Sequence, residues 1–239
     1  MQQNIIEATS YEQLSSLCAE TMLDCIVKKP DAVICLATGH SPQRAYREFV
    51  QQVSARQIDI SQVIFVKLDE WIGVHMDDPV SSEAFLQREI LQPLNVKPEQ
   101  YISFKSDPTN ALTECNRVAA EIKKRGHIDL LILGMGQNGH IGLNEPNEEL
   151  VTGIHLAELA ASTRSHAMLA NAVTIPLLMG ISLGLEDIFA ARRVVLLVTG
   201  AGKAEALAAF DKGIITTRCP VTFLHLHPDL LGIFDRSSL

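Results

Sequence analysis

A histidine with two candidate partners lies in one glycine-rich segment near the middle of the chain. The segment reads Gly-Met-Gly-Gln-Asn-Gly-His-Ile-Gly-Leu-Asn-Glu-Pro over residues 134–146 and contains Asn138, His140 and Glu145. An amide and a carboxylate beside an imidazole can fix its orientation and its protonation state, which proton transfer by histidine requires. Alternatively, the three side chains only hydrogen-bond the loop to itself. The sequence leaves both roles open.

The glycines of this segment also match a dinucleotide-binding pattern. Gly134, Gly136 and Gly139 have the G-x-G-x-x-G spacing. Such a fingerprint opens a strand–helix unit and is followed by an acidic residue about twenty positions further on. Here the segment lies in mid-chain and continues directly into Asn-Glu-Pro. We therefore interpret the glycines as positions where the backbone comes close to a ligand and exposes N–H groups.

A second candidate is the carboxylate of Asp69, which closely follows an apolar run in the sequence Leu-Asp-Glu-Trp at 68–71. A carboxylate at the end of a buried strand is partly dehydrated, which raises its pKa and prepares it as a base. The alternative is that Asp69 caps a turn and Glu70 is solvated. The position after the strand favours the catalytic interpretation.

Two further turns have the composition of anion-binding sites. One contains Thr38, Gly39, His40 and Ser41, and the other is Thr-Gly-Ala-Gly-Lys, ending at Lys203. Each offers small residues, hydroxyls and the start of a helix, where a partial positive charge favours anions. Neither has the spacing of a Walker loop, so the predicted ligand is a monophosphate. Alternatively, Lys203 is an ordinary exposed lysine in the first turn of a helix, and His40 is a turn residue that faces solvent.

The elements that position these segments alternate between strands and helices. Continuous apolar runs, typical of strands buried on both faces, precede the four segments; they cover 32–37, 63–66, 130–133 and 194–198, and a last short strand is predicted at 223–226. Helical spacing is found at 14–25, 82–91, 112–124 and after 203. This alternation predicts an α/β fold with an open, mostly parallel, doubly wound sheet and helices on both faces, as a single domain over 1–239. In such sheets ligands bind beyond the carboxyl ends of the strands, so the four segments are expected to converge on one crevice.

The composition excludes several classes of protein. The 239 residues include 47% hydrophobic side chains and carry a net charge of −8, which is ordinary for a globular domain and argues against a nucleic-acid partner. No apolar run is long enough for a membrane span, and the N-terminus does not resemble a signal peptide. The five cysteines have no C-x-x-C spacing, so no zinc site or disulfide is predicted. We expect a cytoplasmic protein whose cysteines serve as small core residues.

Two segments resemble the signature blocks of the glucosamine-6-phosphate deaminases. These are Leu-Asp-Glu-Trp-Ile-Gly at 68–73 and Gly-Gln-Asn-Gly-His-Ile-Gly-Leu-Asn-Glu-Pro at 136–146. The resemblance covers nearly the whole chain. Around residues 29–39 and 65–71 the chain is more similar still to the galactosamine-6-phosphate isomerase (deaminating) branch of this family.

The resemblance implies an aldose–ketose isomerisation of a 2-amino-2-deoxyhexose 6-phosphate with loss of ammonia. It implies galactosamine 6-phosphate as substrate and tagatose 6-phosphate as product, with no metal and no organic cofactor. His140 matches the histidine that opens the sugar ring, assisted by Asn138 and Glu145, and Asp69 matches the base that moves the C2 proton to C1. The residues that match the phosphate-binding segments are Thr38, Gly39, His40, Ser41 and Lys203.

The chain departs from the family pattern at several positions. Some members have aspartate where this chain has Asn138, and His155 and Ala157 stand where allosterically regulated hexameric members have basic residues. The C-terminal extension of those members is also absent. Allosteric activation and a hexamer are therefore not inferred, and a monomer or small homo-oligomer is expected.

Three alternative functions remain open at this point. A glucosamine-6-phosphate deaminase, giving fructose 6-phosphate, differs only in the sugar epimer. A 6-phosphogluconolactonase has a related glycine–histidine block but lacks Asn-Glu-Pro and usually has arginine at the position of Trp71. A non-catalytic sugar-phosphate sensor would normally carry a basic helix-turn-helix segment, whereas Lys28 and Lys29 are the only basic residues before residue 31.

Overall fold

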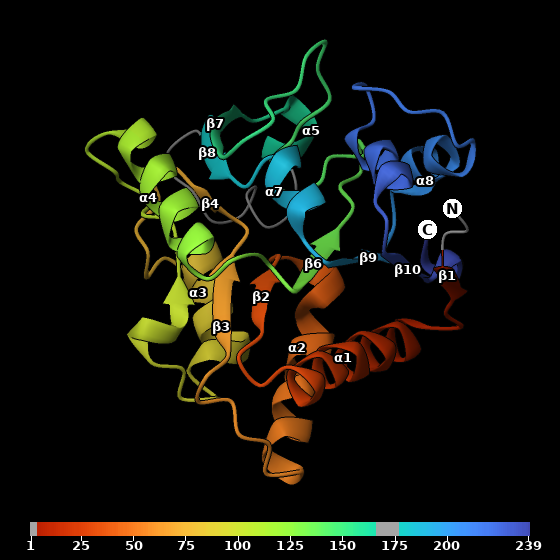
Figure 1. Ribbon diagram of the computed structural model, residues 1–239. Coiled ribbons are helices and arrows are strands. Elements are labelled where there is room, and N and C mark those ends of the chain that lie inside the picture. The colour runs from red at the N-terminus through yellow and green to blue at the C-terminus, as the bar shows by residue number, and fades with distance from the viewer. Residues whose placement is uncertain (1–3, 166–176) are drawn as a thin grey trace.

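Seven parallel strands form the centre of the protein, as a computed structural model that describes residues 4–165 and 177–239 shows (Figure 1). The order across the sheet is β1-β10-β9-β6-β2-β3-β5, so the chain runs outward from the centre in both directions. The strands are β1 (Asn4–Glu7), β2 (Val33–Leu36), β3 (Ile64–Lys67), β5 (Tyr101–Ile102), β6 (Leu130–Gly134), β9 (Arg193–Val198) and β10 (Leu230–Phe234).

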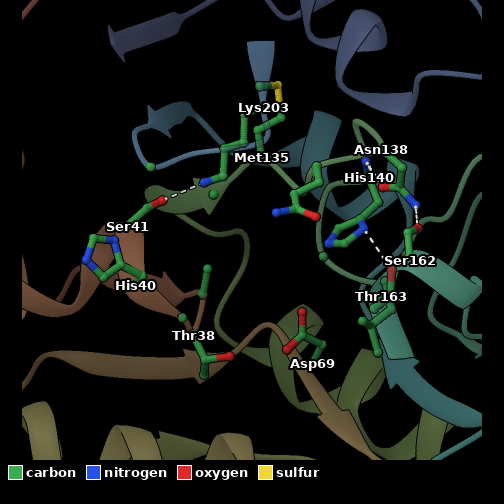
Figure 2. A pocket seen from close by; sticks show the side chains of 18 of the residues that line it. Thr38, His40, Ser41, Asp69, Met135, Asn138, His140, Ser162, Thr163 and Lys203 are labelled. Atoms are coloured by element: carbon green, nitrogen blue, oxygen red, sulfur yellow. Dashed lines mark hydrogen bonds between the residues drawn. The ribbon is translucent and has the colours of Figure 1, made fainter. Parts of the chain in front are cut away.

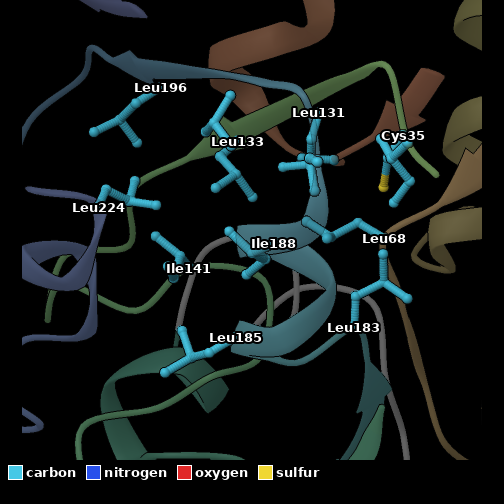
Figure 3. Close-up of a cluster of buried hydrophobic side chains, with 14 of the residues drawn as sticks. Cys35, Leu68, Leu131, Leu133, Ile141, Leu183, Leu185, Ile188, Leu196 and Leu224 are labelled. Carbon is cyan, nitrogen blue, oxygen red and sulfur yellow. The ribbon is translucent and has the colours of Figure 1, made fainter. Parts of the chain in front are cut away.

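Helices cover both faces of this sheet because alternate strand residues point to opposite sides. In β2, Val33 and Cys35 belong to one hydrophobic cluster, whereas Ile34 and Leu36 belong to the other. The first cluster, part of which Figure 3 shows, packs against α4 (Ala111–Lys124), α7 (Leu185–Ala190) and α8 (Ala204–Asp211). The second packs against α1 (Tyr11–Lys28), α2 (His40–Ala55) and α3 (Ser82–Leu86). The predicted doubly wound α/β architecture is confirmed.

A second, smaller sheet that the sequence did not predict lies beside the carboxyl ends of the central strands (Figure 1). It is antiparallel, in the order β4-β8-β7, and consists of β4 (Asp69–Trp71), β8 (Met179–Ser182) and β7 (His155–Glu158). Hydrogen bonds from Leu68 N to Leu36 O, at 3.1 Å, and from Leu183 N to Leu68 O, at 3.0 Å, join it to the central sheet. The polypeptide therefore passes from β3 into β4 with a single residue between them.

The prediction of a strand at 223–226 is wrong. These residues belong to a 3-10 helix, Pro220–Leu226, and the strand that completes the sheet is β10. Pro220 favours the first turn of a helix, and the Thr222 hydroxyl donates to Cys219 O at 2.7 Å, which closes the turn. A four-residue apolar run does not by itself distinguish a strand from a helical turn.

The remaining helical segments are short. The helix predicted at 82–91 is divided into α3 and a π-helical turn, Gln87–Leu91. The others are α5 (Ala161–Arg164) and 3-10 helices at Pro98–Gln100 and Arg236–Ser238. No helix in residues 4–165 and 177–239 is long and apolar enough to cross a membrane. All five cysteines are free, and four of them are buried, as expected of core residues.

Candidate active site

A pocket of about 420 Å³ lies at the carboxyl ends of the central strands, where the four predicted segments converge (Figure 2). Its walls come from the turns that follow β2, β3, β6 and β9, together with the start of α5. Of the residues predicted from the sequence, those that line it are Thr38, Gly39, His40, Ser41, Asp69, Asn138, His140 and Lys203. Glu145 does not line the pocket but lies behind His140. The expected convergence on one crevice is therefore observed.

His140 is held by a set of hydrogen-bonding partners on one side of its ring. Its Nδ1 lies 3.3 Å from Glu145 Oε2 and 3.3 Å from Thr163 Oγ1. The amide of Asn138 joins the set, because its Nδ2 donates to Glu145 Oε2 at 2.8 Å and its Oδ1 accepts the His140 backbone N–H at 3.1 Å. With Nδ1 engaged on this side, Nε2 remains for a ligand in the pocket.

The electrostatics of this group favour an ionised Glu145. Burial of Glu145 disfavours its charged form, but the hydrogen bond and the positive charge of His140, with hydrogen bonds from Thr163 and Asn138, lower the pKa of Glu145 to about 2. An ionised carboxylate can only accept hydrogen bonds, so Glu145 holds the imidazole of His140 at its Nδ1. The ring is thereby oriented for proton transfer at Nε2.

Two residues of this site, Ser162 and Thr163, were not found from the sequence. They lie at the start of α5, where Ser162 Oγ accepts a hydrogen bond from Asn138 Nδ2 at 3.0 Å. Their segment, Ala-Ser-Thr-Arg, is separated by two residues from the end of β7, a strand that the sequence did not predict. The only available signal was the presence of two adjacent hydroxyls, which is too common to indicate a site.

The glycines of the histidine loop have a packing role. A Cβ on Gly136 would overlap the imidazole ring of His140, and a Cβ on Gly139, which has φ +83°, would overlap Cys219 Sγ. Glycine at these positions therefore makes room for the histidine and seats the loop on the core. The side chain that a Cβ on Gly136 would meet is that of His140. This contact explains the glycine without a bound dinucleotide.

Asp69 lies at the start of β4 and is buried. Burial, followed by the negative charge of Glu70, raises the pKa of Asp69 to about 7, against the opposing effects of His140 and Ser82. Figure 2 shows Asp69 and His140 on different walls of the pocket. A carboxyl group with a pKa near neutrality is suited to take up and release a proton.

A largely buried ion-pair network lies next to Asp69 in the chain. Lys67 Nζ lies 2.7 Å from Glu70 Oε2 and 2.8 Å from Glu83 Oε2, and the side chains of Lys67 and Glu70 have no exposed surface. The backbone N–H groups of Trp71 and Ser82 each donate to Glu70 Oε1 at 2.9 Å. The alternative of a solvated Glu70 is therefore wrong, since this carboxylate is buried and joins β4 to the first turn of α3.

The other end of the pocket has a positive character. Lys203 Nζ donates to Ser41 Oγ at 3.0 Å, and burial lowers the pKa of Lys203 to about 8. Within the part of the chain that the structure describes, no carboxylate forms an ion pair with this ammonium group. The helices α2 and α8 both begin here, and Gly39, with φ +104°, allows the sharp turn into α2. Two helix N-termini and this partly buried lysine form a suitable site for a phosphate.

His40 lies beside Ser41 at this end (Figure 2). Its ring stacks on Tyr11 with 4.6 Å between centroids, and its carbonyl oxygen accepts a hydrogen bond from the Tyr11 hydroxyl at 2.6 Å. The residue is exposed but still lines the pocket. The stacking fixes the imidazole at the entrance, next to the anion-binding end.

The described residues offer no evident site for a metal ion. Among them, no group of three or more His, Cys, Asp and Glu side chains is arranged to hold a cation.

Comparison with known proteins identifies relatives that agree with one another in family. Residues 7–231 match the family described as glucosamine-6-phosphate isomerases/6-phosphogluconolactonase. The chain is 44% identical to an Escherichia coli (strain K12) protein named "Putative deaminase AgaI", over 98% of this chain and 92% of that one. It is 37% identical to a glucosamine-6-phosphate deaminase of Thermoanaerobacter pseudethanolicus, over 98% and 93% of the two chains.

Solved structures agree on the fold. A monomeric glucosamine-6-phosphate deaminase superposes with a TM-score of 0.94 at 31% identity, covering 99% of this chain and 98% of that one. A 6-phosphogluconolactonase from Thermotoga maritima superposes with a TM-score of 0.77 at 16% identity, covering 98% and 100%. The second likeness concerns the fold alone.

The ion-pair network of Lys67 predicts that substitutions at two lysines have very different effects on the stability of the protein. Replacing Lys67 with methionine leaves the buried Glu70 and the partly buried Glu83 without their cation, so Lys67→Met should lower the free energy of unfolding by about 3–5 kcal/mol. Lys124 forms an exposed pair with Glu121, and Lys124→Met should lower it by less than about 1 kcal/mol. Chemical denaturation of the two variants measures both values, and equal losses would contradict the structural role of Lys67.

Proposed function

Because the chain belongs to the family of glucosamine-6-phosphate isomerases and 6-phosphogluconolactonases, we propose that it isomerises and deaminates a 2-amino-2-deoxyhexose 6-phosphate. The observation that carries this proposal is one pocket with two chemically different ends. One end has an oriented His140 and a carboxyl group, Asp69, with a pKa near neutrality. The other end has a partly buried cation, Lys203, and two helix N-termini. A sugar phosphate with a reactive carbon far from its phosphate matches this division.

The phosphate is the group that orients the substrate. Lys203 supplies a charge, Ser41 and Thr38 supply hydroxyls, and the first turns of α2 and α8 supply backbone N–H groups. Since burial disfavours the charged form of Lys203, binding of an anion relieves an existing electrostatic penalty. With the phosphate of C6 at this end, C1 and C2 extend toward the other end.

His140 acts first, on the closed sugar ring. Its Nε2 takes the proton of the anomeric hydroxyl and returns a proton to the ring oxygen, so the C1–O5 bond breaks and the aldehyde forms at C1. Glu145 and Asn138 keep the imidazole of His140 oriented through both proton transfers. Between the two transfers, the carboxylate of Glu145 balances the positive charge of the imidazolium. No net proton is consumed.

Asp69 then moves a hydrogen between adjacent carbons. Its carboxylate removes the proton from C2 while the aldehyde oxygen at C1 takes up a proton, which gives a C1–C2 enolamine. The same carboxyl group then returns its proton to C1 as the amino group loses one. The resulting imine at C2 adds water and expels ammonia, which leaves a ketose 6-phosphate. A base that accepts and returns the same proton works best with a pKa near the working pH, as the burial of Asp69 provides.

Lactone hydrolysis is the second candidate reaction for this family. It needs a base that activates water but no partner for a C2 proton, so the oriented carboxyl group at the strand end would have no evident task. Trp71 also lines the pocket where lactonases usually have arginine. We therefore place the amino-sugar reaction first.

We further propose galactosamine 6-phosphate as the preferred substrate, with tagatose 6-phosphate as product. This rests on the sequence similarity around residues 29–39 and 65–71 to the galactosamine branch. Glucosamine 6-phosphate differs only in the direction of the C4 hydroxyl. A site that hydrogen-bonds this hydroxyl rejects the other epimer because its polar partners are left without bonds.

The role of Asp69 predicts the behaviour of one substitution. Asp69→Asn removes the base that acts in the transition state, so kcat should fall about 10²- to 10⁴-fold with little change in substrate affinity. Ammonia release by the purified variant measures this. Asp77→Asn changes an exposed carboxylate of the following loop and should leave kcat unchanged.

The same assignment predicts a pH dependence. The pKa of Asp69 is raised to about 7, and the base must be ionised to work. The kcat/KM of the unaltered protein should therefore fall as the pH is lowered through about 7. Near-normal turnover by Asp69→Asn, or a profile without this limb, would contradict the assignment.

The anion-binding end predicts dependence on the phosphate. Lys203→Met should raise KM roughly ten- to a hundredfold, since a hydrogen bond to a charged group contributes about 1.5–3 kcal/mol. Lys212→Met, at the exposed end of α8, serves as the control and should leave KM unchanged. The amino sugar without its phosphate should react very poorly, and an equal rate for it would disprove this binding mode.

Steady-state kinetics on three compounds test the proposed reaction and its epimer preference. Ammonia release should have a higher kcat/KM with galactosamine 6-phosphate than with glucosamine 6-phosphate, and hydrolysis of 6-phosphogluconolactone should be negligible. The opposite epimer preference would change the substrate and keep the reaction class. Lactone hydrolysis without ammonia release would disprove the deaminase, and no turnover of any of the three would favour a sensor.

A further inference from the structure

Ser82, the first residue of α3, lies between Asp69 and the turn after β2, next to the pocket but not among the residues that line it. The residue is 1% exposed. Its Oγ lies 3.4 Å from Asp69 Oδ1 and 3.5 Å from Thr38 Oγ1. It therefore bridges the carboxylate after β3 and the turn after β2, although the sequence indicated only a helix start at this position.

The backbone of Ser82 is fixed by the buried ion-pair network. Glu70 accepts the N–H groups of Ser82 and Glu83 at 2.9 Å each, one on each carboxylate oxygen. Lys67 in turn contacts both Glu70 and Glu83. The first turn of α3 cannot shift relative to β4 without breaking these bonds, which are costly to lose in a buried setting. The position of the Ser82 hydroxyl is therefore determined by buried groups.

We infer that Ser82 is a positioning residue for Asp69, donating its single hydroxyl proton to Oδ1 and leaving Oδ2 for the proton of the substrate. An ionised carboxylate can only accept a hydrogen bond, so the direction of this bond follows when Asp69 is charged. Thr38 Oγ1 is then free to donate to Ser82 or to the substrate. This inference rests on the proposed role of Asp69 as the base.

The bond also acts on the ionisation of Asp69. Ser82 favours the charged form of the carboxylate, against the larger effects of burial and of Glu70. Without the hydroxyl the base would be protonated at higher pH. The titratable and charged groups that act on Asp69 from the elements around it are Lys67, Glu70, Cys35, Tyr46 and His140.

The test compares two adjacent serines. Ser82→Ala removes the donor to Asp69. Ser81→Ala removes the N-cap of α3, whose Oγ accepts the Ala84 N–H at 2.9 Å and donates to Met76 O at 2.7 Å. Both changes remove one hydroxyl from the same helix start. Only the first should affect Asp69, while Ser81→Ala should lower the melting temperature and leave the pH profile in place.

The expected result is a shift of the acidic limb of kcat/KM to higher pH by roughly one unit in Ser82→Ala. Ser82→Thr, which keeps a hydroxyl, should restore the limb. Ser82→Cys, whose thiol is a weak donor of similar shape, should behave like the alanine variant and provides a second test if that one folds poorly.

A measurement without substrate separates this inference from the proposed function. The carboxyl carbon of Asp69, identified by its loss in Asp69→Asn, is titrated by ¹³C NMR in the unaltered protein and in both serine variants. An upward shift in Ser82→Ala but not in Ser81→Ala supports the inference, and no shift in Ser82→Ala overturns it. A shift in the titration that the pH profile does not follow leaves Ser82 in place and contradicts Asp69 as the base.

Discussion

The site depends on a lysine that is buried completely between two carboxylates. A charge removed from water is costly unless it is paired and hydrogen-bonded, and Lys67 meets this condition through Glu70 and Glu83. The negative charge of Glu70 adds to the burial of Asp69 in raising the pKa of Asp69 to about 7, whereas His140 and Lys67 act in the opposite direction. Glu70, the partner of Lys67, therefore contributes to both the structure and the reactivity of the candidate base.

The geometry of the pocket follows from this pairing. Lys67 ends β3 and Glu70 lies in β4, so their ion pair spans the single residue where the chain leaves the parallel sheet for the antiparallel one. Glu70 also accepts N–H groups from the first turn of α3. Three elements are thereby fixed relative to one another at the carboxyl end of the central sheet. Asp69 lies within this unit, on a rigid part of the protein.

Much of the fold and of the site could be predicted from local patterns. Apolar runs indicated the central strands, and the rule that ligands bind at their carboxyl ends predicted that Asp69, His140 and Lys203 would share one pocket; the family resemblance was confirmed as well. Ser162 and Thr163 could not be predicted, because they reach the histidine loop from a segment with no periodic pattern. Lys67 was missed because a lysine at the end of a strand usually indicates solvent, and its two carboxylate partners follow 3 and 16 residues later.

The two lysines of this region, Lys67 and Lys203, differ in whether a carboxylate of the protein neutralises their charge. Lys67 is fully buried and Lys203 partly buried. Lys67 has two carboxylate partners, whereas Lys203 contacts the Ser41 hydroxyl and, among the described residues, pairs with no carboxylate. A satisfied charge holds elements together and gains nothing from a ligand. An unsatisfied one has a pKa lowered by burial, to about 8, and regains its favoured charged state when an anion arrives. In the proposed binding mode, a phosphate beside Lys203 offsets this effect of burial, whereas the carboxyl group of Asp69 at the other end offers an anion no favourable charge.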